Sequence, residues 1–584
     1  MSSLTRTLQK SSRAVAAASL TAVLAMCSPI AVFCQEGVVA RGQQPAQPAP
    51  QQNPQAQNPI TQPLALSPEI TRQRVGIKDG EVQSLALQDA ISLALQNNLD
   101  IEQFRQGVQI AERSLYSLKG VYDILSSADV NYRSQTVPIV SIFGGGGATS
   151  SLTQRTFTSN FVTSQFMQQT GGYWEADFTN NRTVTSSTAS LLTTNYNPTL
   201  TFNFTQPLMR NFAIDANRRS IQVAKKALDL TDSQFRQRVI EIINSVQRAY
   251  WDLVYAIRNE GIARDSVELA RTQLDNNRKM VEAGTLAPIE LRSTEAQLET
   301  AKGNVIVALQ GVTTAENALK ILLLKDASDK MWSSAIAPTD EPRSSQPTFD
   351  LDEATRLALK NRPELDQIKI QTEQKNIDIK YYQNQTKPQV DLYGNYGNQG
   401  LAGAPSTFVD STGAVLGQRV LPRFNGGYFQ SLNNLFSQDF KSYQVGVRLS
   451  FPWRNRTAEG NLGRSLAEAR QLDARQRQVV ETVQVDVRNA LQAVVASAQR
   501  LEAAKAAELA ANAQLNGEQE RYRAGLSTNF VVLQRQTDLS VARGNTVRAL
   551  TDYNKALADL QRVTGLTLVS NNVQVPATAD ETRK

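Results

Sequence analysis

The feature that most constrains the fold of this chain is an internal duplication. The run KMVEAGTLAPIELRSTEAQLETA begins at Lys279, and ERYRAGLSTNFVVLQRQTDLSVA begins at Glu520. Each reads as a helix, an Ala-Gly break and a second helix. Two more pairs of segments match in the same order: LQDAISLALQNNLDI with LDEATRLALKNRPEL, and TFNFTQPLMRN with VGVRLSFPWRN. Landmarks repeated in one order indicate two copies of one structural unit.

We expect the first repeat over residues 82–348 and the second over 349–566, each in the order helix, two strands, long helix, turn, helix. The connector 326–350 between the repeats should lie at mid-height of the long helices. The basic and then Ala-rich start predicts a signal peptide over 1–34. A membrane anchor, or a lipid attached to Cys34, is the alternative use of this apolar segment. The Gln/Pro-rich stretch, with few apolar residues, predicts a disordered tether over 35–81, and the chain should end in a flexible tail, 567–584.

Apolar residues recur at alternating steps of four and three in the long helical runs, as at Val239, Ile243, Val246 and Tyr250. This spacing is typical of helices that pack along a seam, although an ordinary bundle helix can show it too. Residues 213–282 alone would make a helix of roughly 105 Å. The shorter helical runs, in pairs, add up to about the same length: 85–127, 287–325, 351–386 and 528–564.

Strands are indicated by alternation of apolar and polar residues. In YQVGVRLSF, Tyr443, Val445, Val447, Leu449 and Phe451 fall on one face. Twenty-five of the 38 aromatic residues lie in 129–212 and 381–453. The pattern suits either a half-buried sheet of a soluble domain or barrel strands with an apolar, lipid-facing side. We expect four strands, at 129–137, 197–206, 389–397 and 442–451.

The composition argues against catalysis. The chain has no histidine, and its only cysteines are Cys27 and Cys34, so the commonest general base and metal ligand are missing. The glycine run Gly144–Gly147 lacks the lysine of a phosphate-binding loop. The net charge of +7 is spread along 584 residues, which does not indicate nucleic-acid binding. We therefore expect no catalytic residues, no metal and no cofactor.

The order of these segments resembles the TolC-like outer membrane efflux protein family, on LALQDAISLALQNNLDI, FNFTQPLMRNF, RKMVEAGTLAPIEL, LDEATRLALKNRPELD, VRLSFPW and ERYRAGLSTNFVVLQRQTDL. The resemblance covers about residues 82–566. It implies an α+β membrane protein in which three identical chains, each giving four strands, form a twelve-stranded β-barrel. A long periplasmic α-helical coiled-coil barrel would continue it, and 138–196 and 398–441 would be extracellular loops.

The function that the resemblance implies is an outer membrane channel-tunnel. It would be the passive exit duct of a tripartite efflux system for small molecules, joined through a periplasmic adaptor to an inner membrane pump of the RND or ABC type. The exit duct of a type I protein secretion system is one alternative. A periplasmic coiled-coil adaptor or tether, with a small soluble sheet, is another.

The resemblance also assigns residues to the periplasmic tip of the helices. Adaptor contacts carry over to Gly284, Thr285, Leu286, Gly525, Leu526 and Ser527. The tip constriction carries over to Glu290, Tyr522, Ser527, Val531 and Gln534. Ser527, Val531 and Gln534 stand where well-studied members have charged residues, which leaves Glu290 as the candidate for a charged ring. The alternatives are that the glycines only turn the chain and that Glu290 is an ordinary solvated side chain.

Overall fold

The computed structural model describes residues 74–78, 81–139, 151–343, 350–409, 415–417 and 420–574, all within one compact unit, Thr61–Lys584. The predicted signal peptide, nearly all of the predicted tether, Gly144–Gly147 and the last ten residues of the predicted tail lie outside the described residues.

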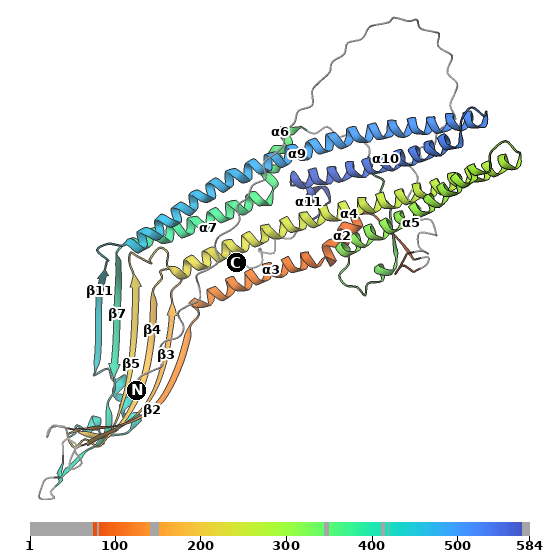
Figure 1. The fold of residues 1–584 in the computed structure, drawn as a ribbon. Coiled ribbons are helices and arrows are strands. Elements are labelled where there is room, and N and C mark those ends of the chain that lie inside the picture. The colour runs from red at the N-terminus through yellow and green to blue at the C-terminus, as the bar shows by residue number, and fades with distance from the viewer. Residues whose placement is uncertain are drawn as a thin grey trace, which may run out of the picture. The chain divides into compact units, whose positions relative to one another are not determined.

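Two helical hairpins dominate this unit. α4 (Ala216–Glu282) turns back into α5 (Ile289–Leu323), and α9 (Arg456–Arg523) turns back into α10 (Asn529–Val563). In each hairpin the two helices pack along each other, and α10 also packs on α4. Figure 1 shows the strands at one end of the long helices and both hairpin turns at the other. The sequence predicts three of these helices to within three residues at each end: 213–282, 287–325 and 528–564.

The remaining helical runs are each broken once. α2 (Leu87–Asn97) and α3 (Leu99–Lys119) meet at Asn98, and α6 (Leu351–Asn361) and α7 (Pro363–Gln385) meet at Arg362. Asn98 leaves the helical conformation, and its side-chain oxygen accepts hydrogen bonds from the backbone of Asp100 and Ile101. Pro363 begins α7 because a proline fits the first turn of a helix. The helix expected to reach residue 127 ends at Lys119, followed by the 3₁₀ turn Gly120–Tyr122.

The main hydrophobic core lies around the middle of α4, where α2, α3 and α5 pack on it. Beside it, β1 (Val82–Leu85) pairs in parallel with β6 (Ala335–Pro338), which follows the 3₁₀ turn Lys330–Ser333. The Tyr250 hydroxyl donates to Asp340 Oδ2 at 2.7 Å and so ties this small sheet to α4. The predicted connector after α5 thus lies halfway along the long helix.

Two chain segments expected to be flexible pack against this core. Arg74, in the predicted tether, is buried, and its guanidinium donates to Glu316 Oε2 at 2.9 Å. Residues 567–574, in the predicted tail, include α11 (Thr567–Ser570). Gln88 and Gln247 donate to Asn571, at 2.8 and 3.2 Å. The tether and tail boundaries at 81 and 567 are therefore wrong, because polar side chains on both segments find buried partners.

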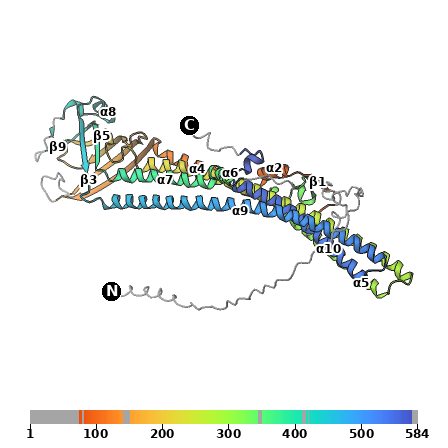
Figure 2. The ribbon, with the colours of Figure 1, turned by 90° about the horizontal axis from the view of Figure 1, so that it is seen from above.

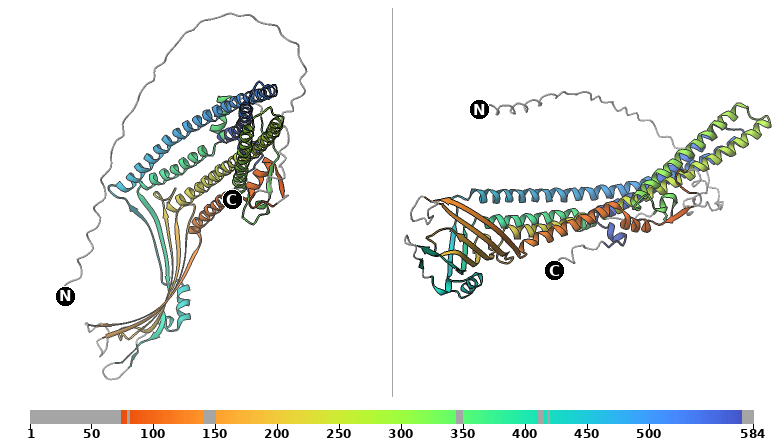
Figure 3. Two further views of the ribbon diagram at one scale, coloured as in Figure 1. Left: turned by 45° about the vertical axis from the view of Figure 1, so that its right-hand side comes forward. Right: turned by 90° about the horizontal axis from the view of Figure 1, so that it is seen from below.

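At one end of the long helices lies one antiparallel sheet in the order β11-β7-β5-β4-β3-β2, with short β8 beside β5 (Figure 1). The predicted strands correspond to β2 (Leu125–Pro138), β5 (Leu192–Pro207), β7 (Gln389–Gln399) and β11 (Lys441–Ser450). The strands lie side by side in a single twisted sheet, as the left panel of Figure 3 shows.

The prediction of four strands per chain is wrong. The segment 138–196, expected to be an extracellular loop, holds two more long strands, β3 (Ser151–Phe166) and β4 (Tyr173–Thr185), which lie between β2 and β5. β3 and β4 each pair with a strand on both sides along most of their length, so most of their backbone groups are satisfied within the sheet.

The second predicted loop, 398–441, also contains secondary structure. It includes β8 (Ala402–Pro405), the paired β9 (Thr407–Val409) and β10 (Val415–Gly417), the 3₁₀ turn Pro422–Phe424 and α8 (Tyr428–Phe436). α8 packs on β5, β7 and β8 at the ends of the strands far from the long helices. Figure 2 shows α8 and the hairpin turns at opposite ends of the drawn unit.

By length and composition, α5 is long and apolar enough to cross a membrane, and it is the one such helix among the described residues. One helix of this kind is weak evidence, because core helices of soluble regions have the same composition. α5 packs along α4 through Val312, Leu319 and Leu323, which are fully buried.

Candidate functional site

Both hairpins turn through the same backbone geometry. Gly284 and Gly525 have φ of +71° and +72°, the left-handed region that favours glycine. In each turn, the backbone N–H of the glycine and that of the next residue donate to backbone carbonyls in the last turn of the helix. In the first hairpin, Gly284 donates to Val281 and Thr285 to Met280. In the second, Gly525 donates to Tyr522 and Leu526 to Arg521. This is a Schellman motif, which satisfies the free carbonyls of a helix end. The sequence match between the two Ala-Gly breaks therefore has a common structural cause.

Just below the turns, a buried polar network joins one hairpin to the other. Asn277 on α4 is fully buried, and its side-chain NH₂ donates to Thr294 Oγ1 at 2.8 Å and to Asn529 Oδ1 at 2.7 Å. Its oxygen accepts from Gln273 at 2.9 Å and from the Tyr522 hydroxyl at 2.9 Å. Both donors and both acceptor positions of Asn277 are therefore used, which is what a buried amide requires.

Asn529 on α10 is the second asparagine at the centre of this network. Its oxygen accepts from Asn277 and Gln273, and its NH₂ donates to Thr294 at 3.0 Å and lies 3.3 Å from Glu290 Oε2. Because every member is satisfied, separating the two hairpins would expose or orphan several polar groups at once. We call Gln273, Asn277, Thr294, Tyr522 and Asn529 the tip network.

Tyr522 holds both parts of the tip together. It belongs to a hydrophobic cluster with Leu515, Val532 and Leu539, against which Met280 of the other hairpin packs. Burial raises the pKa of the Tyr522 phenol, and the nearby negative charge of Glu290 raises it further. The phenol is therefore held in the protonated form, which is the form that donates to Asn277.

The structure brings two of the five predicted constriction residues, Tyr522 and Glu290, to the same network. The other three point elsewhere. Ser527 donates to Glu518 on its own hairpin, Val531 is half-buried, and exposed Gln534 donates to Asp538 at 3.0 Å. Sequence reasoning missed Gln273, Asn277, Thr294 and Asn529, because polar residues in long helices read as solvated positions.

The residues predicted to contact an adaptor surround the turns. Gly284, Thr285, Gly525 and Leu526 are exposed, and Leu286 and Ser527 are half-buried. A Cβ added at Gly284 or Gly525 would meet nothing within 4 Å. The nearby Arg521 and Arg523 pair with Glu518 and Glu520 on α9, at 3.7 and 2.7 Å, rather than with Glu290.

The two faces of the main sheet differ in chemistry. Paired residues of neighbouring strands share a face, so the register connects Val447 to Leu392, Phe202 to Ala176, and Phe178 to Phe161 on one side. Most of the large exposed apolar strand residues lie there: Val130, Tyr132, Phe157, Phe161, Leu200, Phe202, Tyr396, Tyr443, Val445, Val447 and Leu449. The opposite face carries mainly Thr, Ser, Asn, Asp and Glu. This is the alternation of a transmembrane β-strand with one lipid-facing and one water-facing side.

The sheet ends in two open edges. β2 and β11 each pair with one neighbour only, and their side chains are exposed along almost their whole lengths. Open backbone edges of 14 and 10 residues invite pairing with another chain. In a membrane, unpaired edge groups would also have no water to bind.

No group of three His, Cys, Asp or Glu side chains is placed to hold a metal ion within the part of the chain that the structure describes. The described site thus consists of a hydrogen-bonded helical tip, a two-faced sheet and open sheet edges, an arrangement typical of membrane channel proteins.

Comparison with known families agrees with that class. The family model described as "Outer membrane efflux protein" matches residues 175–323 and 354–566. These ranges cover more than half of the chain, so the chain belongs to the outer membrane efflux protein family. It is an outer membrane channel protein whose helices lie on the periplasmic side. The resemblance noted from the sequence is thereby confirmed. A comparison with curated protein sequences gives no match.

Solved structures share the fold at low sequence identity. The CmeC outer membrane channel of Campylobacter jejuni is 15% identical with a TM-score of 0.57, over 82% of this chain and 86% of that one. The outer membrane protein VceC of Vibrio cholerae is 15% identical with a TM-score of 0.55, over 82% and 96%. The open state of the MtrE channel of Neisseria gonorrhoeae is 16% identical with a TM-score of 0.52, over 82% and 89%.

Proposed function

We propose that this chain is one of three identical subunits of an outer membrane exit duct for small molecules. The duct is passive: solutes cross a water-filled tunnel, and the energy comes from an inner membrane pump of the RND or ABC type, joined through a periplasmic adaptor. Membership of the outer membrane efflux protein family supports partners of this kind.

The two open edges of the sheet carry this proposal. A single chain has an apolar face suited to lipid but leaves the outer edge of β2 and the outer edge of β11 unpaired. Because β2 and β11 end a sheet of six alternating long strands, they run in opposite directions, and β11 of one chain can pair antiparallel with β2 of the next. Repeating that contact around a closed ring removes every edge.

The tip network is suited to keeping the proposed tunnel closed at its periplasmic end. It holds the α4–α5 and α9–α10 turns together inside each subunit, at the end of the helices opposite the sheet (Figure 1). We propose that the tunnel narrows here, that Glu290 contributes a ring of three negative charges, and that the exposed turns at Gly284 and Gly525 receive the adaptor. Opening then requires these buried hydrogen bonds to be exchanged for water.

The test is to purify the protein from outer membranes in detergent, determine its mass, and insert it into planar lipid bilayers. The proposal predicts the mass of three chains and discrete ionic currents. Protein that remains monomeric in mild detergent, or that passes no current, contradicts it.

A further inference from the structure

We propose that the β3–β4 hairpin is part of the pore wall, so that three chains close an eighteen-stranded barrel whose polar outer aperture, for hydrated solutes, is wider than twelve strands would give. This inference rests on the proposed trimeric duct and deepens it. It replaces the twelve strands expected from the sequence, because each chain supplies six long strands to the sheet.

The first support is the continuous register of the hairpin. β3 pairs with β2 over 14 residues and with β4 over 13, and β4 pairs with β5 over 12, without a register shift. Strands of 16 and 13 residues exceed the 9–11 residues that cross a bilayer. A hairpin folded outside the barrel would instead leave β2 and β5 paired with each other.

The second support is that the two faces of the sheet continue through the hairpin. On the apolar face, Phe161 pairs with Phe178, which pairs with Leu200. On the polar face, side-chain hydrogen bonds cross from β3 to β4 and from β4 to β5. Thr158 donates to Asn181 at 2.7 Å, Thr179 to Asn160 at 2.8 Å, and Asn203 to Glu175 at 3.3 Å.

The polar ladder continues onto the next strand, because Asn395 of β7 donates to Asn203 of β5. The hairpin thus has the same lipid-facing and water-facing sides as the strands on either side of it.

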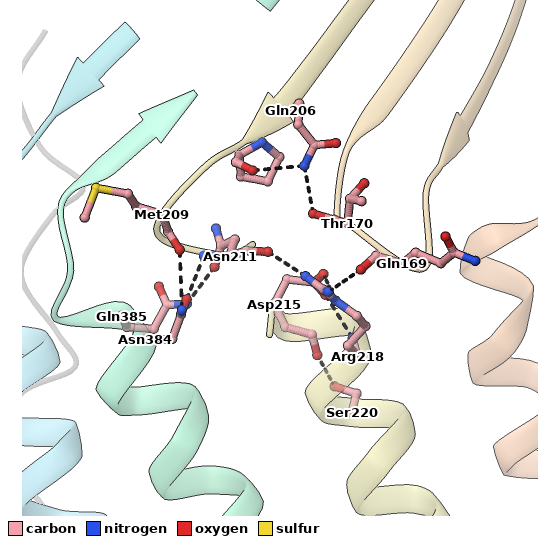
Figure 4. Close-up of polar contacts among 12 residues, drawn as sticks. Gln169, Thr170, Gln206, Met209, Asn211, Asp215, Arg218, Ser220, Asn384 and Gln385 are labelled. Carbon is pink, nitrogen blue, oxygen red and sulfur yellow. Dashed lines mark hydrogen bonds and ion pairs between the residues drawn. The ribbon is translucent and has the colours of Figure 1, made fainter. Parts of the chain in front are cut away.

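The third support is the way the hairpin is fixed at its helix-side turn. Arg218 lies in the first turn of α4. Figure 4 shows it donating to the carbonyl of Gln169, in the turn between β3 and β4, at 3.0 Å. Arg218 also donates to the Asn211 carbonyl and to Asp215, both at 2.6 Å, and Gln206 donates to the Thr170 carbonyl at 3.0 Å.

The same turn is closed by Gly171, which has φ +70°. A Cβ at Gly171 would lie 2.8 Å from the Asn211 carbonyl oxygen, so the turn is built against the strand–helix junction. Short turns on the periplasmic side are typical of outer membrane barrels.

The width of the pore follows from the strand count. Barrel diameter grows roughly in proportion to strand number, and barrels of 16–18 strands leave an aqueous channel. Eighteen strands therefore give an outer section about half again as wide as twelve. With a polar inner face, that section is a wider water-filled mouth, and the limiting radius of the duct lies at the helical tip.

The experiment compares the full chain with a variant lacking residues 151–191, in which β2 can pair directly with β5. Thr201 lies on the polar face of β5. Thr201→Cys is introduced into both, and intact cells are treated with maleimide polyethylene glycols of graded size. We expect the largest polymer that reacts with the full chain to be about 1.5-fold wider than the largest that reacts with the deletion variant. If both variants assemble as trimers and react up to the same polymer size, the eighteen-stranded wall is overturned but the proposed duct is not. Failure of the full chain itself to form trimers overturns both.

A second measurement decides the matter if the deletion variant does not assemble. Asn160 and Phe161 are neighbours on β3 that face opposite sides of the sheet. In the wall, a water-soluble maleimide labels Asn160→Cys, whereas Phe161→Cys reacts only with a lipid-soluble one. Equal labelling of both positions by the water-soluble reagent overturns the inference. The unsubstituted protein is the control for Cys27 and Cys34.

Discussion

The Tyr522 hydroxyl donates a hydrogen bond of 2.9 Å to the side-chain oxygen of Asn277, and the two residues lie 245 positions apart in the chain. This bond joins the second helical hairpin to the first inside one subunit. It places a buried donor at the proposed constriction, and opening the tunnel there would break this hydrogen bond and cost its free energy.

Replacing Tyr522 by Phe should loosen the tip without unfolding the protein. The ring keeps its packing, and Asn277 keeps the hydrogen bond from Gln273, so we expect a cost of about 1 kcal/mol. In planar bilayers, the variant should show longer or more frequent open periods than the wild type. Tyr553→Phe, at a buried tyrosine far along α10 from the hairpin turn, is the matched control. Equal open times for wild type and Tyr522→Phe would show that the bond does not restrain the tip.

The tip should also weaken at alkaline pH. The folded protein raises the pKa of Tyr522 above its ordinary value near 10. The stabilising contribution is therefore complete below about pH 10 and is lost as the pH rises through the raised pKa. Hydrogen exchange of the backbone around Asn277 should accelerate above that pH in the wild type and less so in Tyr522→Phe.

Glu290→Gln should bring the phenol pKa down, because it removes the nearby negative charge that contributes to the upward shift. An ultraviolet titration with an unchanged tyrosine profile in Glu290→Gln would contradict this electrostatic link.

The buried ion cluster of Arg74, Glu316 and Lys320 should be a large contributor to stability. Glu316 pairs with Arg74 at 2.9 Å and with Lys320 at 2.7 Å, and the side chains are almost completely inaccessible. Glu316→Gln leaves two buried cations without a counter-ion, so we expect a loss of about 3–5 kcal/mol. The control is Glu299→Gln, whose pair with Lys302 is exposed and should contribute less than about 1 kcal/mol. Denaturant unfolding of both variants gives the comparison, and equal losses would rule out the buried cluster as an anchor.

A bulky residue at the second hairpin turn should impair efflux more than assembly. Gly525→Trp adds a side chain into open space at the proposed adaptor surface, and its positive φ costs about 1–2 kcal/mol for any other residue. We expect normal trimer levels with reduced export in cells. Gly460→Trp, on α9 near the sheet, adds the same side chain away from the tip. Wild-type export by Gly525→Trp at normal protein levels would remove this turn from the adaptor surface.

The sequence predicts the parts of this fold that have a clear period. The alternation at Tyr443, Val445 and Val447 locates β11. The repeated Ala-Gly breaks locate both hairpin turns, because glycine is the residue best suited to the left-handed conformation there. β3 escaped prediction because its Thr, Ser, Asn and Gln residues lack an alternating apolar pattern. Its pairing with β2 and β4, rather than its own composition, makes it a strand.

The candidate site is predictable only in part, for a similar reason. Tyr522 and Glu290 could be inferred because family resemblance assigns them, but Asn277 lies in the polar run LDNNRK and reads as solvated. Its burial depends on α10 packing against α4, a contact between distant segments that the local sequence does not encode.

The most direct test of the account joins the two edges of the sheet by a disulfide. Within one chain, β2 and β11 are five strand spacings apart, roughly 24 Å, which is beyond the reach of a disulfide. Cysteines placed at Gln444 and, in turn, at Asp129, Asn131 or Arg133 all lie on the polar face. Mild oxidation in outer membranes should give covalent trimers for at least one pair, visible as a ladder of one, two and three chains in denaturing gels. If every pair leaves only single chains, the subunits do not close their sheets onto one another, and the duct proposed here does not exist.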